Sequence, residues 1–372
     1  MKLPIRTLQP SEFEEFMRFL ERAYGHSRGF FQRAYPHLYQ PTPEKCSTYY
    51  VIKKEGKILS HIGLYPLRIV TAGVELPVGG IGGVATLPAA RGHGHMTRLS
   101  RHVIGEMRAQ AYPLSWLDGD RQRYNAFGWE LAASFYQLTF SRRSLSWGQA
   151  TPTPIEEVLP GEAVEHISRF MPHPQRRPEL EDQLRKADLR VWVSAAGYVI
   201  AQGQDRQRIK LVELVSASGN EIGLISAVLA WNFGEQLTWE LSTWDTAQLA
   251  RLMPYAADWK ARAQGMYRIN ELTQLLQPAE HFLQERAAGV RDFALTLGIR
   301  EHDRLTATTI ALQAGVLQIR AGRHAAQYME LSPITAARLI LGGPPIPELS
   351  SIPGGLRALL PLPVYVPPLD YV

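Results

Sequence analysis

The sequence has almost no cysteine and no long apolar run. Its single cysteine, Cys46, excludes a disulfide within the chain and is typical of a reducing compartment. The longest apolar segment, IGLISAVLAW at residues 222–231, is about half the length that a membrane-spanning helix needs. The first residues, MKLPIRTLQPSEFEEF, lack the apolar core of a signal peptide. We therefore expect a cytoplasmic protein with no membrane segment.

Charge of one sign is not concentrated anywhere in the chain. The 40 Lys and Arg residues against 35 Asp and Glu residues give a formal net charge of +5, but the arginines are spread along the sequence. A nucleic-acid-binding surface needs basic residues gathered together. We expect no nucleic-acid partner, although the positive balance allows an anionic ligand.

Cys46 has no histidine nearby, which favours an inert thiol.

The length of 372 residues predicts two or three domains rather than one core. A Pro- and Thr-rich segment, SWGQATPTPIEEVLPG, keeps neither a helical nor a strand period and marks a first seam. We predict three units, at residues 1–145, 146–284 and 285–372. Each mixes helices with antiparallel strands, so the fold class is α+β.

The first unit has clear periodic signals. Ser11 and Glu14 form a candidate capping box at the start of a helix that Gly25 ends. Apolar residues at helical spacing, from Met96 to Met107, predict a second helix of about three to four turns after the glycine turn. Strands are expected at IRTL, in the meander from Thr48 to Leu87, at AYPLSWLDG and in NAFGWELAASFYQLTFSRR.

The second and third units follow the same kind of pattern. In the second unit we predict helices at residues 176–187 and 246–265, and strands at 190–203, 209–217 and 221–231. In the third we predict strands at 292–301 and 311–322, and a helix at 332–343 that Ser332 caps. The tail PLPVYVPPLDYV is too apolar to remain solvated, so we expect it to pack against the protein.

The segment RGHGHM, residues 91–96, combines flexible backbone with positive charge at the start of a predicted helix. Helix N-termini leave N–H groups unpaired and attract phosphate oxygens. Gly92 and Gly94 allow several N–H groups to converge, while Arg91, His93 and His95 add side-chain donors. This arrangement suits a pyrophosphate.

Other interpretations of this segment are weaker. No Lys-Ser/Thr pair follows and a third glycine is missing, so it is neither of the two common nucleotide-binding loops. His93 and His95 form an H-x-H pair, but no further ligand cluster lies nearby, and we expect no bound metal. Asp118 and Asp120, in LDGDRQ, fit a turn better than a pair of catalytic acids, although they could line the acceptor side.

The loop resembles the acyl-CoA loop of the GNAT acetyltransferases, in which Arg or Gln is followed by two free positions, Gly, one free position, and Gly or Ala. Arg91 and Gly94 match that pattern, whereas Met96 departs from it. Some thirty residues later, RYNAFGWELA resembles the enhanced intracellular survival (Eis) family of GNAT proteins. The matching positions there are Tyr124, Phe127, Gly128, Trp129 and Glu130.

This resemblance implies a GNAT domain at 1–145, a degenerate second GNAT-like domain at 146–284 and a sterol-carrier-protein-like α/β domain at 285–372. It also implies acetyl-CoA as cosubstrate. The strand GGVATL would splay from its neighbour and hold the pantetheine. The residues implied to bind acetyl-CoA are Val84, Ala85, Thr86, Arg91, Gly92, His93, Gly94, His95 and Met96.

The resemblance also assigns catalytic roles. Tyr124 is the expected general acid, because a phenol with a pKa near 10 is protonated at neutral pH and can give its proton to the departing sulfur. The C-terminal carboxylate of Val372 is the expected base. A free α-carboxyl group is a weak base unless it is partly desolvated or acts through water, so Asp370 and a water molecule stay open as alternatives.

The resulting hypothesis is an acetyl-CoA-dependent N-acetyltransferase that acts on a primary amine of a small molecule or a lysine. The acceptor is not readable from the sequence. The alternative is a non-catalytic protein that binds acyl-CoA or lipid on the same fold. The resemblance further implies a homo-oligomer, with a hexamer as one expected form.

Overall fold

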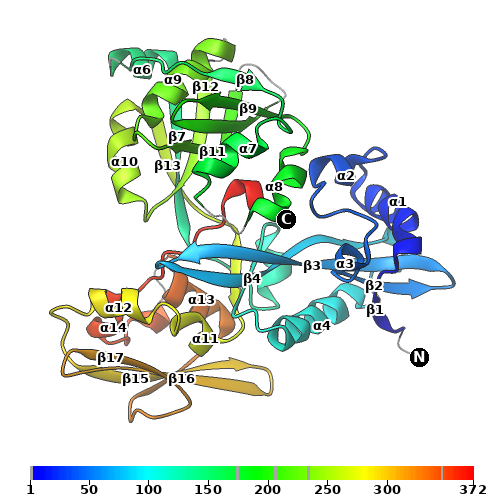
Figure 1. Ribbon diagram of the computed structural model, residues 1–372. Coiled ribbons are helices and arrows are strands. Elements are labelled where there is room, and N and C mark those ends of the chain that lie inside the picture. Colours follow the sequence, from blue (N-terminus) through cyan, green and yellow to red (C-terminus); the bar gives the residue numbers. More distant parts are fainter. Residues whose placement is uncertain (1–2, 149, 173–175, 204–207, 233–234, 345–346) are drawn as a thin grey trace.

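The computed structural model describes residues 3–148, 150–172, 176–203, 208–232, 235–344 and 347–372, and these residues form three β-sheets (Figure 1). No helix in this described part of the chain is both long and apolar enough to cross a membrane.

The first sheet has the strand order β1-β2-β3-β4-β5-β14-β6. Its strands are β1 (Ile5–Thr7), β2 (Tyr49–Lys54), β3 (Lys57–Thr71), β4 (Val74–Thr86), β5 (Leu114–Leu117), β6 (Glu130–Leu131) and β14 (Met266–Ile269). The helices packed around it are η1 (Pro10–Glu12), α1 (Phe13–Tyr24), α2 (Phe30–Ala34), α3 (Pro43–Cys46), η2 (Pro88–Ala90), α4 (His95–Ala109) and α5 (Arg121–Asn125). All pairs are antiparallel except β4 with β5.

Helices α1 and α4 cover opposite faces of this sheet (Figure 1). Successive strand residues point to opposite faces. Tyr49 and Val51 of β2 therefore pack in the core that contains α1, while Tyr50 and Ile52 pack with Leu99, Val103 and Met107 of α4. The two predicted helices and the predicted strand meander are confirmed in kind.

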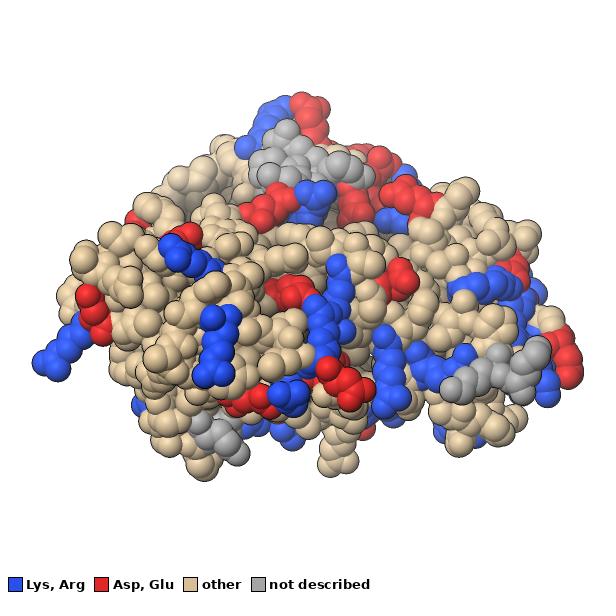
Figure 2. Space-filling model, turned by 90° about the horizontal axis from the view of Figure 1, so that it is seen from below, with Lys and Arg blue, Asp and Glu red and all other residues tan. Residues whose placement is uncertain are grey.

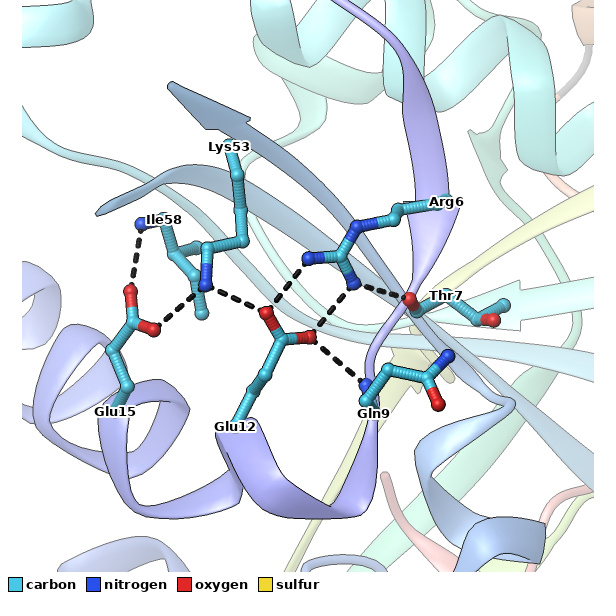
Figure 3. Close-up of polar contacts among 7 residues, drawn as sticks. All are labelled: Arg6, Thr7, Gln9, Glu12, Glu15, Lys53 and Ile58. Atoms are coloured by element: carbon cyan, nitrogen blue, oxygen red, sulfur yellow. Dashed lines mark hydrogen bonds and ion pairs between the residues drawn. The ribbon is translucent and has the colours of Figure 1, made fainter. Parts of the chain in front are cut away.

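The start of α1 is held by a network of charges (Figure 3). The Glu12 carboxylate accepts two bonds from Arg6, each of 2.7 Å, and one of 2.7 Å from Lys53, which also binds Glu15. The capping box predicted for Ser11 and Glu14 is wrong, because a short 3-10 turn precedes the helix and moves the box to Gln9 and Glu12. Gly25 ends α1 at φ 73°, as predicted.

The second sheet has the order β13-β7-β12-β11-β10-β9-β8. Its strands are β7 (Ser134–Ser141), β8 (Glu156–Val158), β9 (Leu189–Ser194), β10 (Gly197–Gln202), β11 (Arg208–Ser216), β12 (Gln236–Ser242) and β13 (Asp258–Ala263). Its helices are α6 (Arg142–Trp147), α7 (Val164–Phe170), α8 (Arg177–Leu184), α9 (Glu221–Asn232), α10 (Thr246–Leu252) and η4 (Met253–Tyr255).

Two predictions for this unit are wrong. Residues 221–231, predicted as a strand, lie in α9. The helix is apolar on nearly all sides and is buried, so its sequence lacks the polar face that would have marked a helix. The helix predicted at 246–265 ends near Pro254, which cannot continue it, and the rest forms edge strand β13. All six residues of β13 are exposed, so no alternating apolar pattern marks them as a strand.

The third sheet has the order β17-β16-β15-β18, with strands β15 (Phe293–Glu301), β16 (Arg304–Gln313), β17 (Val316–Ala321) and β18 (Tyr328–Leu331). Helices α11 (Leu272–Leu276), α12 (Glu280–Arg286), α13 (Pro333–Leu341), η5 (Pro347–Leu349) and α14 (Gly354–Leu359) accompany it, and η6 (Pro368–Asp370) lies in the tail. Ser332 caps α13 and Gly342 follows it, as predicted. This layer packs against the far end of the β3–β4 hairpin (Figure 1).

The sheets are not built from continuous segments. Strand β7 belongs to the second sheet although it precedes residue 145, and β14 belongs to the first sheet although it follows β13. The chain therefore exchanges strands between the first two units. The domain limits at 145 and 284 stay predictions.

On the face shown in Figure 2, acidic and basic side chains are interspersed, and no single sign dominates it.

We predict that Glu12→Gln destabilises the protein by about 1.5–3 kcal/mol, because Arg6 and Lys53 lose their shared carboxylate. Hydrogen bonding from Arg6 and Lys53 lowers the pKa of Glu12 from 4.5 to about 2. The stabilisation is therefore present above about pH 5 and is lost as the pH falls towards 2. Urea unfolding at several pH values should show the difference from wild type narrowing over that range.

The matched control is Glu14→Gln, which removes an exposed carboxylate two residues further along the chain. Equal effects of the two substitutions on the free energy of unfolding would contradict the role of the Glu12 network.

Candidate active site

The turn before α4 has the backbone that its glycines predict. Gly92 and Gly94 both adopt left-handed conformations, at φ 79° and 70°, and Gly94 is the N-cap residue of α4. No side chain caps this end of the helix. By helix geometry the N–H groups of His95, Met96 and Thr97 have no carbonyl partner within the helix. They lie at the mouth of a cavity.

This cavity has a volume of about 590 Å³ and runs from β4 to the start of α4. Eight of the nine residues predicted to bind acetyl-CoA line it: Val84, Ala85, Thr86, Arg91, Gly92, Gly94, His95 and Met96. His93 does not. Its ring Nδ1 instead lies 2.9 Å from the Arg91 carbonyl oxygen, and its ring stacks on His95 at 5.9 Å between centroids.

Sequence reasoning missed two prominent residues of this cavity, Tyr24 and Arg123. The Tyr24 hydroxyl donates a 2.9 Å hydrogen bond to the carbonyl oxygen of Val84, which connects α1 to the edge of β4. Arg123 directly precedes Tyr124, so its position beside the predicted acid could have been read from the chain. No comparable signal marks Tyr24, which depends on how α1 packs.

Strand β4 parts from β5 beside this cavity. The two strands pair only from Val78 to Gly80, although β4 continues to Thr86. The register between β3 and β4 also shifts near Gly83, which has φ 60°. The extra residue of such a bulge turns the strand and leaves its backbone out of the ladder. The second half of β4 is therefore open on the β5 side.

His61 of β3 supports this bulge from below. Its ring Nδ1 donates to the Gly83 carbonyl oxygen at 2.7 Å, and the side chain is fully buried. Burial lowers the pKa of His61 to about 3, so the imidazole is neutral. The described residues contain no group of three or more His, Cys, Asp or Glu side chains placed to hold a metal ion.

Tyr124 lies in α5, which Asp120 caps; it is not among the lining residues of this cavity, although the preceding Arg123 is. Its side chain is buried with Met96 and Val84 at the edge of the cluster that carries α4, and its ring meets Trp129 edge-on. Burial raises the pKa of its hydroxyl above the ordinary value. The phenol is therefore protonated at neutral pH, as a proton donor must be.

The C-terminal tail reaches the opening between β4 and β5. A methyl group added at Gly82 would lie 3.0 Å from the terminal carbonyl carbon of Val372, and one at Gly80 would lie 2.9 Å from its side chain. The preceding Tyr371 ring contacts Trp116 of β5 at 4.9 Å. The prediction that the tail packs against the protein is confirmed, and Val364, Val366 and Leu369 are almost completely buried.

Residues of the second unit hold the tail in place. Arg176 donates to the Asp370 carboxylate at 2.7 Å and to Glu213 at 2.5 Å, and Gln183 donates to the other Asp370 oxygen at 2.9 Å. Lys186 donates to the Leu369 carbonyl oxygen at 2.5 Å. Both oxygens of Asp370, the alternative base, are thus bound by the second unit.

Gln264 holds the backbone of the tail at Val366, which precedes Asp370 in the chain. Its amide donates to the carbonyl oxygen of Val366 at 2.7 Å and accepts from the N–H of the same residue at 2.8 Å. Gln264 precedes β14, the strand that enters the first sheet. The exchange of strands between the sheets therefore also positions the tail.

Comparisons with known proteins indicate the family of the first part of the chain. Residues 4–132 match the acetyltransferase (GNAT) domain family. These residues form a GNAT acetyltransferase domain. The match supports assignment of the chain as an acetyltransferase, and domains of this family use acetyl-CoA. A search of curated proteins finds no match to the sequence.

Solved structures are similar over the whole chain. A GCN5-related N-acetyltransferase from Anabaena variabilis has 17% identity and a TM-score of 0.72, with 100% of both chains covered. One from Kribbella flavida has 16% identity and a TM-score of 0.72, covering 100% of this chain and 98% of its own. Eis1 from Mycobacterium abscessus has 16% identity and a TM-score of 0.64, with 98% of each chain covered. At these identities the likeness establishes the fold.

The residues present in the GNAT domain fit acetyl-CoA. Methyl groups added at Gly92 or Gly94 would meet no atom within 4 Å, so the backbone there is accessible to a large anion. Unpaired amides and the positive end of the α4 dipole would face its pyrophosphate, with Arg91 beside them. The open edge of β4 offers the amide partners that a pantetheine chain needs.

We predict that Asp370→Asn loosens the C-terminus, because Arg176 then loses one of its two carboxylate partners and the tail loses its charged anchor. Digestion with a carboxypeptidase, followed by mass spectrometry of the native protein, should release Val372 at least about tenfold faster than in wild type, since cleavage requires local opening.

Glu181→Gln provides the control, since Glu181 lies on α8 but forms an exposed pair with Arg185. Release at the wild-type rate in Asp370→Asn would show that the ion pair does not hold the tail.

Proposed function

We propose that the protein transfers the acetyl group of acetyl-CoA to a primary amine of a small molecule or a lysine acceptor. The observation that carries this proposal is the position of Val372, whose carboxyl end lies against Gly82 where β4 and β5 part. The GNAT domain match gives the cosubstrate, and the seat of the tail supplies a carboxylate at the open edge of β4.

The chain's own residues would divide the chemistry between them. Backbone N–H groups of Val84, Ala85 and Thr86 polarise the thioester carbonyl and hold the pantetheine. As the new N–C bond forms and the C–S bond breaks, Tyr124 gives its proton to the sulfur. Its buried ring and protonated hydroxyl support that role. Acetyl-CoA supplies the activated acetyl group.

The acceptor amine must lose protons in order to attack and to become an amide. We propose the Val372 carboxylate as the group that takes a proton, directly or through a water molecule. Tyr39, Tyr65 and Ala85 belong to the cluster against which Val372 packs, and this apolar wall limits hydration of the terminus. Asp370 is the weaker choice because Arg176 and Gln183 already bind it.

The proposal extends to the whole chain. We infer an Eis-like arrangement in which residues 1–145 act as the catalytic GNAT domain, 146–284 as a degenerate GNAT-like domain, and 285–372 as a sterol-carrier-like domain that delivers the tail. We also propose a homo-oligomer. For the rival function of lipid binding, the third unit would need an open interior, and Leu362, Val364 and Val366 of the tail are buried in its core.

The test follows release of free CoA thiol from acetyl-CoA with a panel of amines. Wild type should show amine-dependent release. Tyr124→Phe should lower kcat by about 10²–10³-fold, because the sulfur then departs without a proton donor. A chain extended by two glycines after Val372 should lose activity to a similar extent, since the carboxylate is moved from its seat.

Tyr136→Phe, in β7 of the second sheet, is the matched control and should retain wild-type kcat. Loss of activity in Tyr124→Phe but not in the extended chain would move the base to Asp370 or water. Acetyl-CoA binding without release of thiol, for every amine tried, would favour the binding protein instead.

A separate prediction concerns the seat of the tail. Gly82→Ala should lower kcat by about tenfold, because its methyl group would approach the Val372 carbonyl carbon to 3.0 Å and push the terminus away. Steady-state kinetics with one amine acceptor would measure this. Gly105→Ala, at a site on α4 with no atom within 4 Å, should leave kcat unchanged. Equal kinetics for both variants would count against the proposed position of the base.

A further inference from the structure

A second and larger cavity, of about 750 Å³, lies between residues 27–35 of the GNAT domain, the second unit and the tail. It is bordered by α2, by the start of β9, by β10 and β11, and by the tail itself. Figure 1 shows the C-terminus between α2 and α8, at the junction of the first two units.

The lining of the cavity includes the residue that precedes the proposed base. Tyr371 is part of its lining and directly precedes Val372, whose carboxyl end lies on Gly82. The Tyr371 ring also contacts Trp116 at the end of β5. An acceptor in this cavity would therefore lie beside the residue that carries the proposed base.

The described lining residues include three cations and one carboxylate: Arg33, Lys186, Lys210 and Asp188. Among the residues that the structure describes, neither Arg33 nor Lys186 forms an ion pair. Arg33 donates to the carbonyl oxygen of Arg28, and Lys186 to that of Leu369. The charges of Asp370 and Glu179 act on Lys186, but Arg176 binds Asp370 and Lys45 pairs with Glu179. Two positive charges therefore remain without a carboxylate partner.

Lys210 differs from these two because Glu240 neutralises it at 3.0 Å. Its ammonium also lies 6.0 Å from the centre of the Tyr371 ring. Lys210 therefore lies on the side of the cavity next to Tyr371. The excess positive charge of the lining comes from Arg33 and Lys186.

Negative charge lies near the inner end. The Tyr35 hydroxyl, in the cavity lining, has a pKa raised by burial and then by the charge of Asp118. Asp118 also acts on Tyr371, and it follows β5 directly. The terminal carboxylate belongs to Val372, which directly follows Tyr371. An ammonium group would thus be attracted inwards, towards the atoms that react with it.

Apolar groups make up about half of the cavity wall between these charges. Phe30, Tyr35, Leu189, Val212 and Leu369 contribute rings and aliphatic groups to the lining. Such walls favour a ligand with an apolar body rather than a fully hydrated polycation.

We propose that this cavity binds the acceptor, and that the acceptor is a zwitterion: an amine joined by an apolar body to a carboxylate that Arg33 and Lys186 attract. The inference rests on the proposed acetyl transfer and adds the acceptor's chemical class. It excludes polyamine-like and aminoglycoside-like acceptors as preferred substrates, because each further ammonium would meet the cations of the cavity.

The experiment compares amines of equal length that differ only at the far end: 6-aminohexanoate, hexylamine and 1,6-diaminohexane, with the four- and eight-carbon series beside them. We expect kcat/KM to be highest for the amino acid, and about tenfold or more lower for the diamine. The difference should shrink with added salt, because mobile ions screen the attraction.

Arg33→Glu reverses one exposed charge of the lining and should not disturb the core. It should lower kcat/KM for 6-aminohexanoate by about tenfold and leave that for hexylamine nearly unchanged. Arg22→Glu, an exposed position on α1 outside the lining, is the control and should not alter the preference.

The outcomes separate the two proposals. If amines are acetylated but the diamine is preferred, or the far end has no effect, the acceptor class is wrong while acetyl transfer stands. If the preference exists but Arg33→Glu does not change it, this cavity is not the acceptor site. If no amine in the panel or among lysine peptides is acetylated while acetyl-CoA binds, the proposed function itself fails.

Discussion

The seat of the C-terminus in the opening between β4 and β5 is the constraint on which the rest of the structure depends. A parallel pair that stops after Gly80 leaves backbone groups of β4 without strand partners, and such groups need other partners when they are buried. The chain fills part of this opening with its own last residue and leaves the remainder as a cavity that ends at the N-terminus of α4. Two distant parts of the sequence thus form one site.

Holding a chain end in a fixed place is entropically costly, because terminal residues normally fray. Here the cost is offset by several kinds of contact. The buried Arg176 links Asp370 to Glu213, and Gln264 clamps the backbone at Val366. These anchors come from the second unit and from the strand exchanged between sheets. A second unit with no glycine loop of its own still has a physical task in this arrangement, which is to position the tail.

Sequence reasoning worked where a local pattern determines the structure. The glycine turn at 92–94, the helix that follows it and the cap at Ser332 depend on nearest neighbours, and all three are found in the structure. It failed at α9, whose even burial removes the polar face that marks a helix, and at β13, whose full exposure removes strand alternation. The capping box moved by two residues because a short 3-10 turn precedes α1.

The site shows the same division. The family resemblance implied nine residues between Val84 and Met96, and all of them except His93 line the cavity. The sequence could not predict the cavity positions of Tyr24, Arg33 and Lys186, since each reaches its cavity through the packing of a separate element.

The most direct measurement is a crystal structure of the protein with CoA. We expect the pyrophosphate on the first amides of α4, the sulfur near the Tyr124 hydroxyl, and Val372 still against Gly82. A sulfur bound away from Tyr124, or a displaced tail, would contradict this expectation.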